Sequence, residues 1–245
     1  LTSCLGKTLE RMIANRLQFL AETRGWLSDD QAGFRKLRSC EDQTIRLSQA
    51  INDGFQSRPA KRTVLALLDF SKAFDRVWRS ELLNRLLDIG VPPQYVRWCA
   101  GFLRNRLARV RLFGHNSRYH KLAQGVPQGA VLSPLLFILY INAVVDHLPP
   151  SVSVSLYADD IAVWSSHPIK EVAARHVEAA INIIAETCAR LKLDLNAAKC
   201  EVSFFSSGTH EAKWKPVVSL GNHPLAFNPN PVFLGITYDR TLCFN

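Results

Sequence analysis

The sequence lacks an apolar run long enough to cross a lipid bilayer. Its longest candidate, Pro134 to Val145, is interrupted by Asn142 and falls short of the ~18 consecutive apolar residues that a spanning helix requires. The amino end also lacks the basic start, apolar stretch and small-residue cleavage site of a secretory signal. Because 47% of the residues are hydrophobic, a buried core is expected. We therefore expect a soluble globular protein with no membrane partner.

Cysteine and methionine are both sparse. The six cysteines form no C-x-x-C pair and no cysteine–histidine spacing typical of a zinc site, so we expect reduced thiols in an intracellular protein. The only methionine, Met12, lies inside a helical pattern, and the chain opens at Leu1. We therefore expect an excised fragment of a longer protein.

Acidic residues are missing from the middle of a chain whose net charge is +9. Between Asp88 and Asp146 there is no Asp or Glu, but there are seven basic residues: Arg97, Arg104, Arg106, Arg109, Arg111, Arg118 and Lys121. Basic side chains that neutralise phosphates release counterions, so this segment indicates a polyanionic partner such as a nucleic acid. A solvated basic face is the alternative. The same two interpretations apply to the basic loop that contains Arg35.

Hydrophobic periodicity predicts a mixture of helices and short strands. Helices are expected over Thr2–Glu22, from a Ser39–Asp42 capping box through Phe55, and from a Ser80 cap through Leu87. Further helices are expected at 92–104, from Ser133 and at 170–191, and strands at 63–70 and 202–205. A basic hairpin is expected at 109–123.

Two separate stretches place carboxylates at the ends of apolar strands. In SVSVSLYADDIAVWSS, residues 151–166, the alternation predicts a half-buried strand, and Asp159 and Asp160 form the tip of a hairpin. Asp69 ends the apolar run TVLALLDF. Adjacent carboxylates repel each other unless a cation lies between them, and Mg²⁺ prefers oxygen ligands. An acidic turn and a strand-end cap are the alternatives.

If the two acidic strand ends meet in one sheet, they can hold two divalent ions ~3.5 to 4 Å apart, which would stabilise an in-line phosphoryl displacement.

Residues 124–134, QGVPQGAVLSP, form a glycine- and proline-rich loop. Such a loop would let a ligand backbone approach closely; an ordinary loop-to-helix junction is the alternative.

The order of these motifs resembles the reverse transcriptases of non-LTR (LINE-like) retrotransposons, most of all those of the ingi-type clade. The resemblance covers essentially the whole chain and lies in seven segments: LTSCLGKTLERMIANRL, QAGFRKLRSCEDQ, DFSKAFDRVW, QGVPQGAVLSPLLFILYIN, YADD, NAAKCE and FLGITYD. It implies an α+β fold, the palm of a right-hand polymerase with an antiparallel sheet and packed helices. Residues 1–62 would be partial fingers and 63–245 the palm, with a basic fingers segment inserted at about 91–123, the primer grip at the end and the thumb missing.

The resemblance also implies the residues of the catalytic centre. Asp69, Asp159 and Asp160 would hold two Mg²⁺ ions, with Mn²⁺ as a substitute, together with the backbone at Phe70. Lys199 would be the general acid for the diphosphate.

The remaining roles that the resemblance implies concern the substrates: a dNTP, an RNA template and a DNA primer or target DNA. The dNTP would meet Lys72, Ala73, Gln128 and Gly129, and Phe74 would exclude a 2′-hydroxyl by a steric clash. The nucleic acid strands would meet Pro127, Tyr157, Leu234, Gly235, Arg35, Arg109 and Arg111. Family biology implies a nuclear protein.

The chain also departs from the family pattern. It begins too late to include the arginine and upstream lysine that bind the triphosphate in the family, so we expect the isolated fragment to polymerise poorly or not at all. The alternatives are an RNA-dependent RNA polymerase, which Phe74 disfavours, and a non-catalytic maturase-like RNA-binding protein or decayed element copy.

Overall fold

The computed structural model describes residues 4–211 and 214–243. Its contacts divide the chain into two compact units. The sheet unit comprises Ser28–Ser71, Asn142–Arg190 and Asp194–Asn245, and the helical unit comprises Leu1–Leu27, Lys72–Ile141 and Leu191–Leu193. The expected division into fingers at 1–62 and palm at 63–245 stays a prediction. Thr2, where the first helix was expected to begin, and residues 244–245 of the expected palm lie outside the described residues.

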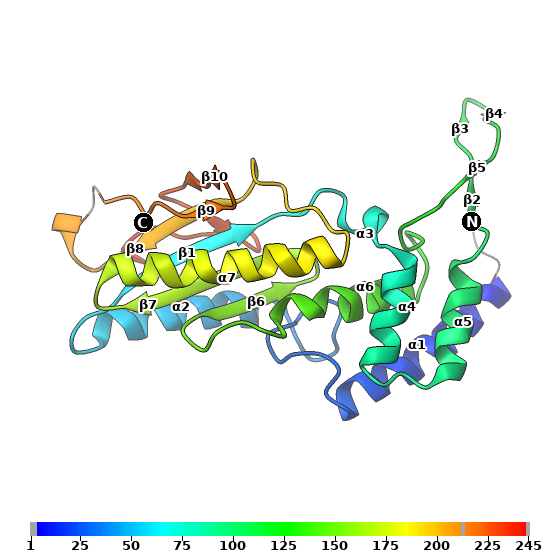
Figure 1. The fold of residues 1–245 in the computed structure, drawn as a ribbon, viewed down its shortest axis with the longest axis horizontal. Helices are drawn as coiled ribbons and strands as arrows, with labels where there is room; N and C mark the ends of the chain where they lie inside the picture. Colours follow the sequence, from blue (N-terminus) through cyan, green and yellow to red (C-terminus); the bar gives the residue numbers. More distant parts are fainter. Residues whose placement is uncertain (1–3, 212–213, 244–245) are drawn as a thin grey trace. The chain divides into compact units, whose positions relative to one another are not determined.

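The sheet unit is built on a five-stranded sheet in the order β11-β8-β1-β7-β6 (Figure 1). Three of its four pairings are antiparallel, and β11 joins β8 in parallel. The strands are β1 (Arg62–Leu68), β6 (Ser153–Tyr157), β7 (Asp160–His167), β8 (Glu201–Phe205) and β11 (Ala226–Phe227). The expected hairpin at 151–166 and the strands at 63–70 and 202–205 are therefore confirmed, with ends shifted by one or two residues. The expected tip is wrong: Tyr157 pairs with Asp160, so Ala158 and Asp159 form the turn and Asp160 is the first residue of β7.

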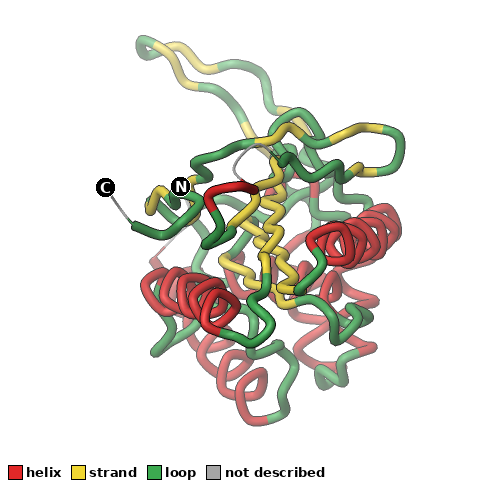
Figure 2. Tube along the Cα trace, turned by 90° about the vertical axis from the view of Figure 1, so that its left-hand side faces the viewer, coloured by secondary structure: helices red, strands yellow, loops and turns green. Residues whose placement is uncertain are grey.

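Two helices cover opposite faces of this sheet, α2 (Cys40–Gln56) and α7 (Lys170–Arg190) (Figures 1 and 2). Leu47 and Ile51 of α2 pack in one core cluster with Leu65 of β1 and Trp164 of β7. Because side chains alternate along a strand, the buried neighbours of Leu65 point to the face that α7 covers. The Ser39–Asp42 capping box that was expected to open α2 is confirmed.

One expectation about β6 is wrong. The serines that alternate with its apolar residues predicted a face open to solvent, but Ser155 is fully buried. Its hydroxyl donates a 2.6 Å hydrogen bond to Oε1 of the buried Gln43 on α2. A short hydroxyl side chain with a partner can be buried at little cost, so β6 is covered on both faces.

Short elements complete the sheet unit. They are η1 (Asn142–Val145), η2 (Thr209–Glu211), and the strand pairs β9 (Ser219–Leu220) with β10 (His223–Pro224) and β12 (Val232–Phe233) with β13 (Ile236–Thr237). Phe233 and Tyr238 join the core cluster on the α2 side, and the Tyr238 hydroxyl donates to the Thr44 carbonyl. The β12–β13 hairpin is thereby fixed against the sheet.

The helical unit contains α1 (Cys4–Thr23), α3 (Ala73–Arg76), α4 (Arg79–Asp88), α5 (Pro93–Leu103) and α6 (Ser133–Ile141). Eight of the nine α6 residues are buried, which fits its continuous apolar sequence. The expected Ser80 cap of α4 is wrong: the helix begins at Arg79, and its N-cap Trp78 makes no side-chain capping bond. No helix in the described part of the chain is long and apolar enough to span a membrane.

The basic hairpin of the helical unit is a long two-stranded ribbon with two short paired regions. Near its base, β2 (Leu107–Ala108) pairs with β5 (His120–Lys121), and near its tip β3 (Arg111–Leu112) pairs with β4 (His115–Asn116). The hairpin expected at 109–123 is therefore confirmed.

Candidate active site

The pairing of β1 with β7 fixes the position of the acidic residues. Its last pair is Leu68 with Ile161, so Asp69 leaves β1 where Asp160 begins β7. Two positions before Asp69, Leu67 pairs with Ala162, and alternation places Asp69 and Asp160 on the same face of the sheet. Both residues line one cavity of about 450 Å³. The structure thus brings together acids that lie far apart in the sequence.

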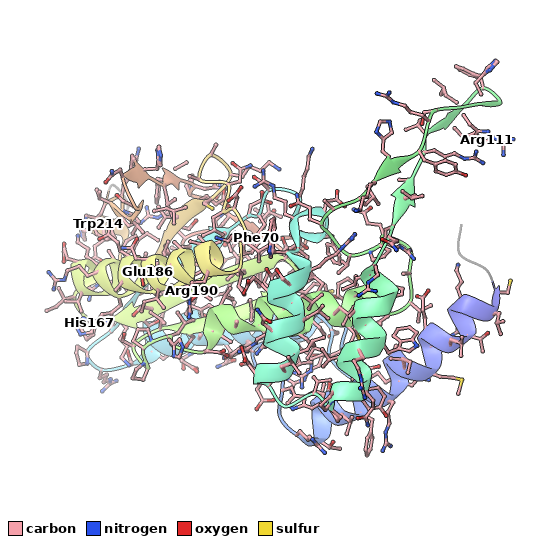
Figure 3. The ribbon with its side chains drawn as sticks, turned by 45° about the vertical axis from the view of Figure 1, so that its right-hand side comes forward. Phe70, Arg111, His167, Glu186, Arg190 and Trp214 are labelled. Carbon is pink, nitrogen blue, oxygen red and sulfur yellow. The ribbon has the colours of Figure 1, made fainter. Side chains whose placement is uncertain are left out.

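Asp69 is held at the strand end by backbone pairing. Its carbonyl accepts a 2.8 Å hydrogen bond from the Asn196 amide, and the Ser71 amide donates to the Asp194 carbonyl. These two bonds bracket the antiparallel bridge between Phe70 and Leu195. In such a bridge the polar groups of the bracketed residue point away from its partner strand, so the Phe70 backbone is directed away from Leu195. Figure 3 labels Phe70 at this position.

The Asp69 carboxylate is incompletely satisfied. Its Oδ2 atom is buried and has no hydrogen-bond partner in the described residues. The Lys199 ammonium lies 3.6 Å from this oxygen, which is an ion pair beyond hydrogen-bond distance. A buried carboxylate oxygen without a donor is costly, and a cation bound in the cavity would remove that cost.

Asp160 lies in an unfavourable electrostatic environment. Partial desolvation of its carboxyl raises its pKa above the ordinary value, and the negative charges of Asp159 and Asp69 raise that pKa further. The residue still exposes much of its surface at the cavity mouth. Repulsion among carboxylates of this kind favours a bound cation.

The third acid has a different position. Asp159 and Ala158 form the two-residue turn between Tyr157 and Asp160, which pair with each other, and Ala158 adopts φ +60°. Asp159 is not among the residues that line the cavity. Among the described residues, no group of three or more His, Cys, Asp or Glu side chains is arranged to hold a metal ion. The acids therefore do not form a preassembled three-ligand cage.

Further residues of the cavity lining come from the carboxyl-terminal segment. Leu234 and Gly235, the turn of the β12–β13 hairpin, line the cavity together with Lys199 and Glu201. Both turn residues have positive φ, +48° for Leu234 and +85° for Gly235. Glu201, which begins β8, was not predicted to be a site residue, and its register with Leu67 places it beside the acids.

A second cavity, of about 550 Å³, lies within the helical unit and is lined by Phe74, Gln128 and Gly129. The Phe74 ring stacks on Phe137 with ring centroids 4.1 Å apart. The Gln128 amide donates a 2.9 Å hydrogen bond to Asp75, a partner that the sequence did not indicate. Three residues predicted to contact the dNTP from separate motifs therefore lie together.

Backbone bonds hold these two motifs against each other. The Val126 amide donates to the Phe74 carbonyl and the Gly125 amide donates to the Val77 carbonyl. A Cβ atom added at Gly125 would lie 2.7 Å from the Asp75 carbonyl oxygen, so only glycine allows this approach.

The other predicted residues of the helical unit lie outside that cavity lining. Lys72 has φ +53° and precedes α3, whose first residue is the buried Ala73. The Pro127 carbonyl accepts a hydrogen bond from Ser133. Arg109 and Arg111 lie on the exposed ribbon.

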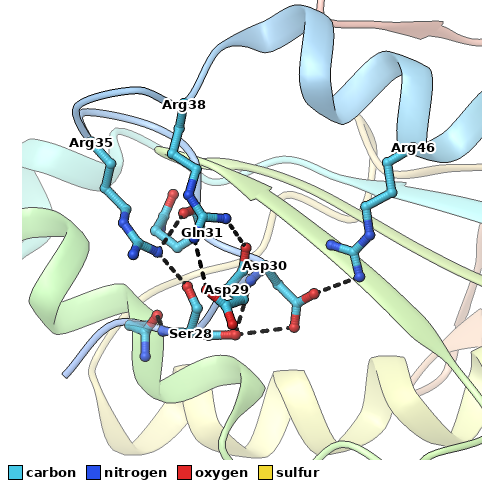
Figure 4. Close-up of polar contacts among 8 residues, drawn as sticks. Ser28, Asp29, Asp30, Gln31, Arg35, Arg38 and Arg46 are labelled. Atoms are coloured by element: carbon cyan, nitrogen blue, oxygen red, sulfur yellow. Dashed lines mark hydrogen bonds and ion pairs between the residues drawn. The ribbon is translucent and has the colours of Figure 1, made fainter. Parts of the chain in front are cut away.

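The loop at residues 28–38 is hydrogen-bonded to β6, the first strand of the acidic hairpin. The Ala32 amide donates to the Leu156 carbonyl and the Leu156 amide donates to the Asp30 carbonyl, so the loop pairs with β6. Figure 4 shows the ion pairs that hold it: Arg38 with Asp29 at 2.7 Å and Arg46 with Asp30 at 2.6 Å.

Arg35 lies in the same network. Its guanidinium donates to the Ser28 and Gln31 carbonyls (Figure 4). These two carbonyl groups belong to its own loop, so Arg35 helps to hold the loop in place. Its contact with primer or template stays a prediction.

Gly33 is a residue of this loop that the sequence interpretation missed. A Cβ atom built there would lie 2.2 Å from the Ala158 nitrogen and 2.9 Å from the Tyr157 carbonyl carbon. Both are backbone atoms of the turn that precedes Asp159, so they cannot rotate away. The only sequence signal was a glycine among polar loop residues, which is common in ordinary loops.

A profile of the family "Reverse transcriptase (RNA-dependent DNA polymerase)" matches residues 1–237. This chain belongs to the reverse transcriptase family. The match spans both cavities and confirms the predicted family. Relatives from mobile elements confirm the coarser identification as a reverse transcriptase domain of the non-LTR retrotransposon kind.

Relatives of this reverse transcriptase domain come from mobile elements of Drosophila melanogaster. It is 31% identical to the RNA-directed DNA polymerase from mobile element jockey, over 98% of this chain and 26% of the relative. It is 32% identical to the probable RNA-directed DNA polymerase from transposon BS, over 100% of this chain and 27% of the relative. The chain thus spans about a quarter of the length of these relatives.

Solved structures of telomerase share the fold. The structure of telomerase from Candida tropicalis in complex with a fragment of telomeric RNA aligns with a TM-score of 0.66 at 14% identity, over 95% of this chain and 36% of that chain. Apo telomerase from the same organism, truncated from its C-terminal domain, gives 0.65 at 12% identity over 97% of this chain and 44% of that chain. The α+β, palm-like fold predicted for this reverse transcriptase is confirmed.

We expect Gly33→Ala to destabilise the sheet unit, because the added methyl group must displace the backbone of the acidic turn. Overpacking of this kind costs about 1 to 3 kcal/mol, which urea unfolding would measure. Gly101→Ala is the matched control, since a Cβ atom at Gly101 meets nothing within 4 Å and φ there is not positive. Equal stability of the Gly33→Ala variant and the parent chain would contradict the clash.

We expect Asp160→Asn to raise the melting temperature in metal-free buffer at pH 7. The folded-state pKa of Asp160 is raised, so its ionised form costs stability above that pKa, and the cost disappears as pH falls below the ordinary value of 3.8. The difference between variant and parent should therefore shrink with acidification. Asp53→Asn is the control, because the Asp53 carboxylate accepts a hydrogen bond from Gln49. A lower melting temperature for Asp160→Asn at pH 7 would contradict the repulsion.

Proposed function

We propose that this chain is the catalytic part of an RNA-directed DNA polymerase, which joins the α-phosphorus of a dNTP to a primer 3′-hydroxyl and releases diphosphate. The observation that carries the proposal is the shared cavity of Asp69 and Asp160, in a chain of the reverse transcriptase family. Carboxylates converging at the end of buried strands suit metal-assisted phosphoryl transfer.

The residues of the cavity fit a divalent ion. The Asp69 oxygen without a hydrogen-bond partner and the mutual repulsion at Asp160 both favour a hard cation with oxygen ligands. Asp69, Asp159, Asp160 and the Phe70 carbonyl would hold Mg²⁺, with Mn²⁺ as a substitute. When bound, two such ions would supply charge stabilisation to the attacking and leaving oxygens.

Lys199 would donate a proton to the leaving diphosphate. Its side chain is 66% exposed and its ammonium lies 3.6 Å from Asp69, so Lys199 borders the cavity and remains able to reach a substrate group. Leu234 and Gly235, which also line the cavity, would position the primer end, and Tyr157 would pack beside it.

The cavity of the helical unit would recognise the sugar and base of the dNTP. The stacking of Phe74 on Phe137 fixes the Phe74 ring, and a fixed ring rejects a 2′-hydroxyl by a clash that a mobile side chain would avoid. Gln128, held by Asp75, Gly129 and Pro127 would line the base and template side. The backbone at Lys72 and Ala73 would meet the triphosphate.

We propose an RNA template and a DNA primer or target DNA as partners, with Arg35, Arg109 and Arg111 as contacts, and a nuclear location where target DNA primes synthesis. Support comes from the relatives, which are polymerases of mobile elements, and from the absence of acids between Asp88 and Asp146. We also propose an element of the ingi-type clade, on the ordered motif set alone.

We expect Asp69→Asn and Asp159→Ala each to abolish Mg²⁺-dependent incorporation of dTTP on poly(rA)/oligo(dT). Primer extension would be measured with the full open reading frame that encodes this chain, because the isolated chain is expected to polymerise poorly or not at all. Asp53→Asn, on the surface of α2, should retain the parent rate. Removal of Mg²⁺ by chelation should stop the reaction in every active variant.

The metal assignment has a second readout that does not require turnover. Millimolar Mg²⁺ should raise the melting temperature of the parent chain, because a ligand that binds only the folded state stabilises it. Mg²⁺ should leave the melting temperature of the Asp69→Asn variant unchanged. Incorporation that survives Asp69→Asn, or an equal Mg²⁺ shift in both chains, would contradict the proposal.

We expect Phe74→Val to increase incorporation of ribonucleotides relative to deoxynucleotides, because the smaller side chain leaves room for a 2′-hydroxyl. The ratio of rUTP to dTTP incorporation would be measured under the conditions of the preceding assay. Phe102→Val is a comparison variant for loss of an aromatic ring elsewhere in the helical unit, since Phe102 stacks on Trp98. An unchanged ratio in Phe74→Val would favour the alternative interpretation, an RNA-dependent RNA polymerase.

A further inference from the structure

The ribbon of the helical unit is exposed along its whole length. Every residue from 107 to 124 is exposed, including apolar side chains such as Val110 at 68% and Phe113 at 92%. Figure 3 shows the ribbon projecting beyond α5, with Arg111 near its tip. Isolated two-stranded ribbons are marginally stable in water, so this segment is a poor structural element by itself.

The base of the ribbon is firmly attached. The Arg79 guanidinium donates to the Leu122, Gln124 and Gly125 carbonyls, at 2.8 to 3.0 Å. The Leu122 amide donates to the Arg106 carbonyl across the two strands. The ribbon therefore leaves the unit in a fixed direction and exposes both of its faces.

The two faces differ in chemistry. Leu107 pairs with Lys121 and Arg111 pairs with Asn116, and side chains two positions apart share a face. One face therefore carries Arg109, Arg111, Tyr119 and Lys121 beside Leu107, and the Arg109 guanidinium lies 5.0 Å from the centroid of the Tyr119 ring. The other face carries Ala108, Val110 and Leu112, together with His120, which pairs with Ala108, and Arg118, two positions before it. Three cations and an aromatic ring thus gather on one side, whereas the other side is mainly apolar and carries one arginine.

We propose that the face formed by Arg109, Arg111, Tyr119 and Lys121 binds single-stranded RNA, the template of the proposed reaction. The proposal deepens the proposed function by naming this site and the state of its ligand. The three cations contact successive phosphates, and Tyr119 stacks on an unpaired base.

The chemistry of this face favours a single strand over a duplex. A basic groove or surface that presents an aromatic ring among its cations is the usual design of single-strand sites, because every base offers a π-face. In an A-form duplex the bases are stacked inside the helix, so Tyr119 would find no base to stack on. The absence of acids between Asp88 and Asp146 leaves no carboxylate on the ribbon to repel phosphate.

The test is fluorescence anisotropy with a labelled uridine oligonucleotide, in chelator and without dNTP. The triple variant Arg109→Gln, Arg111→Gln, Lys121→Gln should lower the slope of log affinity against log salt by about 2, at about 0.7 per phosphate contact on a single strand. Tyr119→Ala should weaken binding about 5- to 100-fold, and Tyr119→Phe should restore it because the ring remains.

The matched control is the other face of the same ribbon. Val110→Ser with Leu112→Ser should leave RNA affinity within about twofold, since exposed substitutions rarely have larger effects. The binding assay contains chelator and no dNTP, so its result does not depend on catalysis, and failure of the proposed function and failure of RNA binding are read separately.

Three results would overturn the proposal. The first is an unchanged affinity and salt slope in the triple variant. The second is an equal loss of affinity for a duplex of the same length in Tyr119→Ala, which would indicate a general phosphate surface. The third is a loss of binding in the control pair as large as in the basic face, which would indicate a partner that contacts the apolar side.

Discussion

The antiparallel pairing of β1 with β7 is the interaction on which the rest of the acidic site depends. Seven consecutive pairs run from Arg62–His167 to Leu68–Ile161, and a shift by one residue would turn every side chain of β7 to the other face. Such a shift would turn Asp160 away from the face of Asp69 and remove Trp164 from its packing against α2. The packing of Trp164 and Leu65 against α2 therefore fixes the register, and the register places the carboxylates.

The fold was largely predictable from local patterns because most elements have strong periodic signals. The α2 capping box, the apolar run of α6 and the alternation before Asp159 each indicated the correct element. The start of α4 was missed because Ser80 suggested a cap, whereas the helix begins one residue earlier without a side-chain cap. The burial of Ser155 was missed because its partner, Gln43, comes from a helix far away in the sequence.

Site residues could be predicted from the sequence where the residue type itself indicates the chemistry. They could not be predicted where the site depends on how separate backbone segments approach each other. Asp69, Asp160 and Lys199 come together as the family resemblance implied, but the stretch around Asp159 and Asp160 alone left metal binding and an exposed acidic turn as equal interpretations. The sequence gives no distances, so it could not show that Asp159 stands apart from the cavity lining. Nor could it identify Asp75 as the partner of Gln128, because that contact depends on how two loops meet.

The loop before α2 also affects the tendency of the protein to aggregate. β6 is the outermost strand of the sheet, and outermost strands offer free amide and carbonyl groups to other chains. The bonds from Asp30 and Ala32 to Leu156 occupy part of that border next to the acidic turn, and Gly33 permits the close approach. The loop that holds the acidic turn in place thereby also prevents strands of other molecules from pairing with β6. Detachment of the loop would expose this edge of the sheet beside the site, and aggregation could begin there.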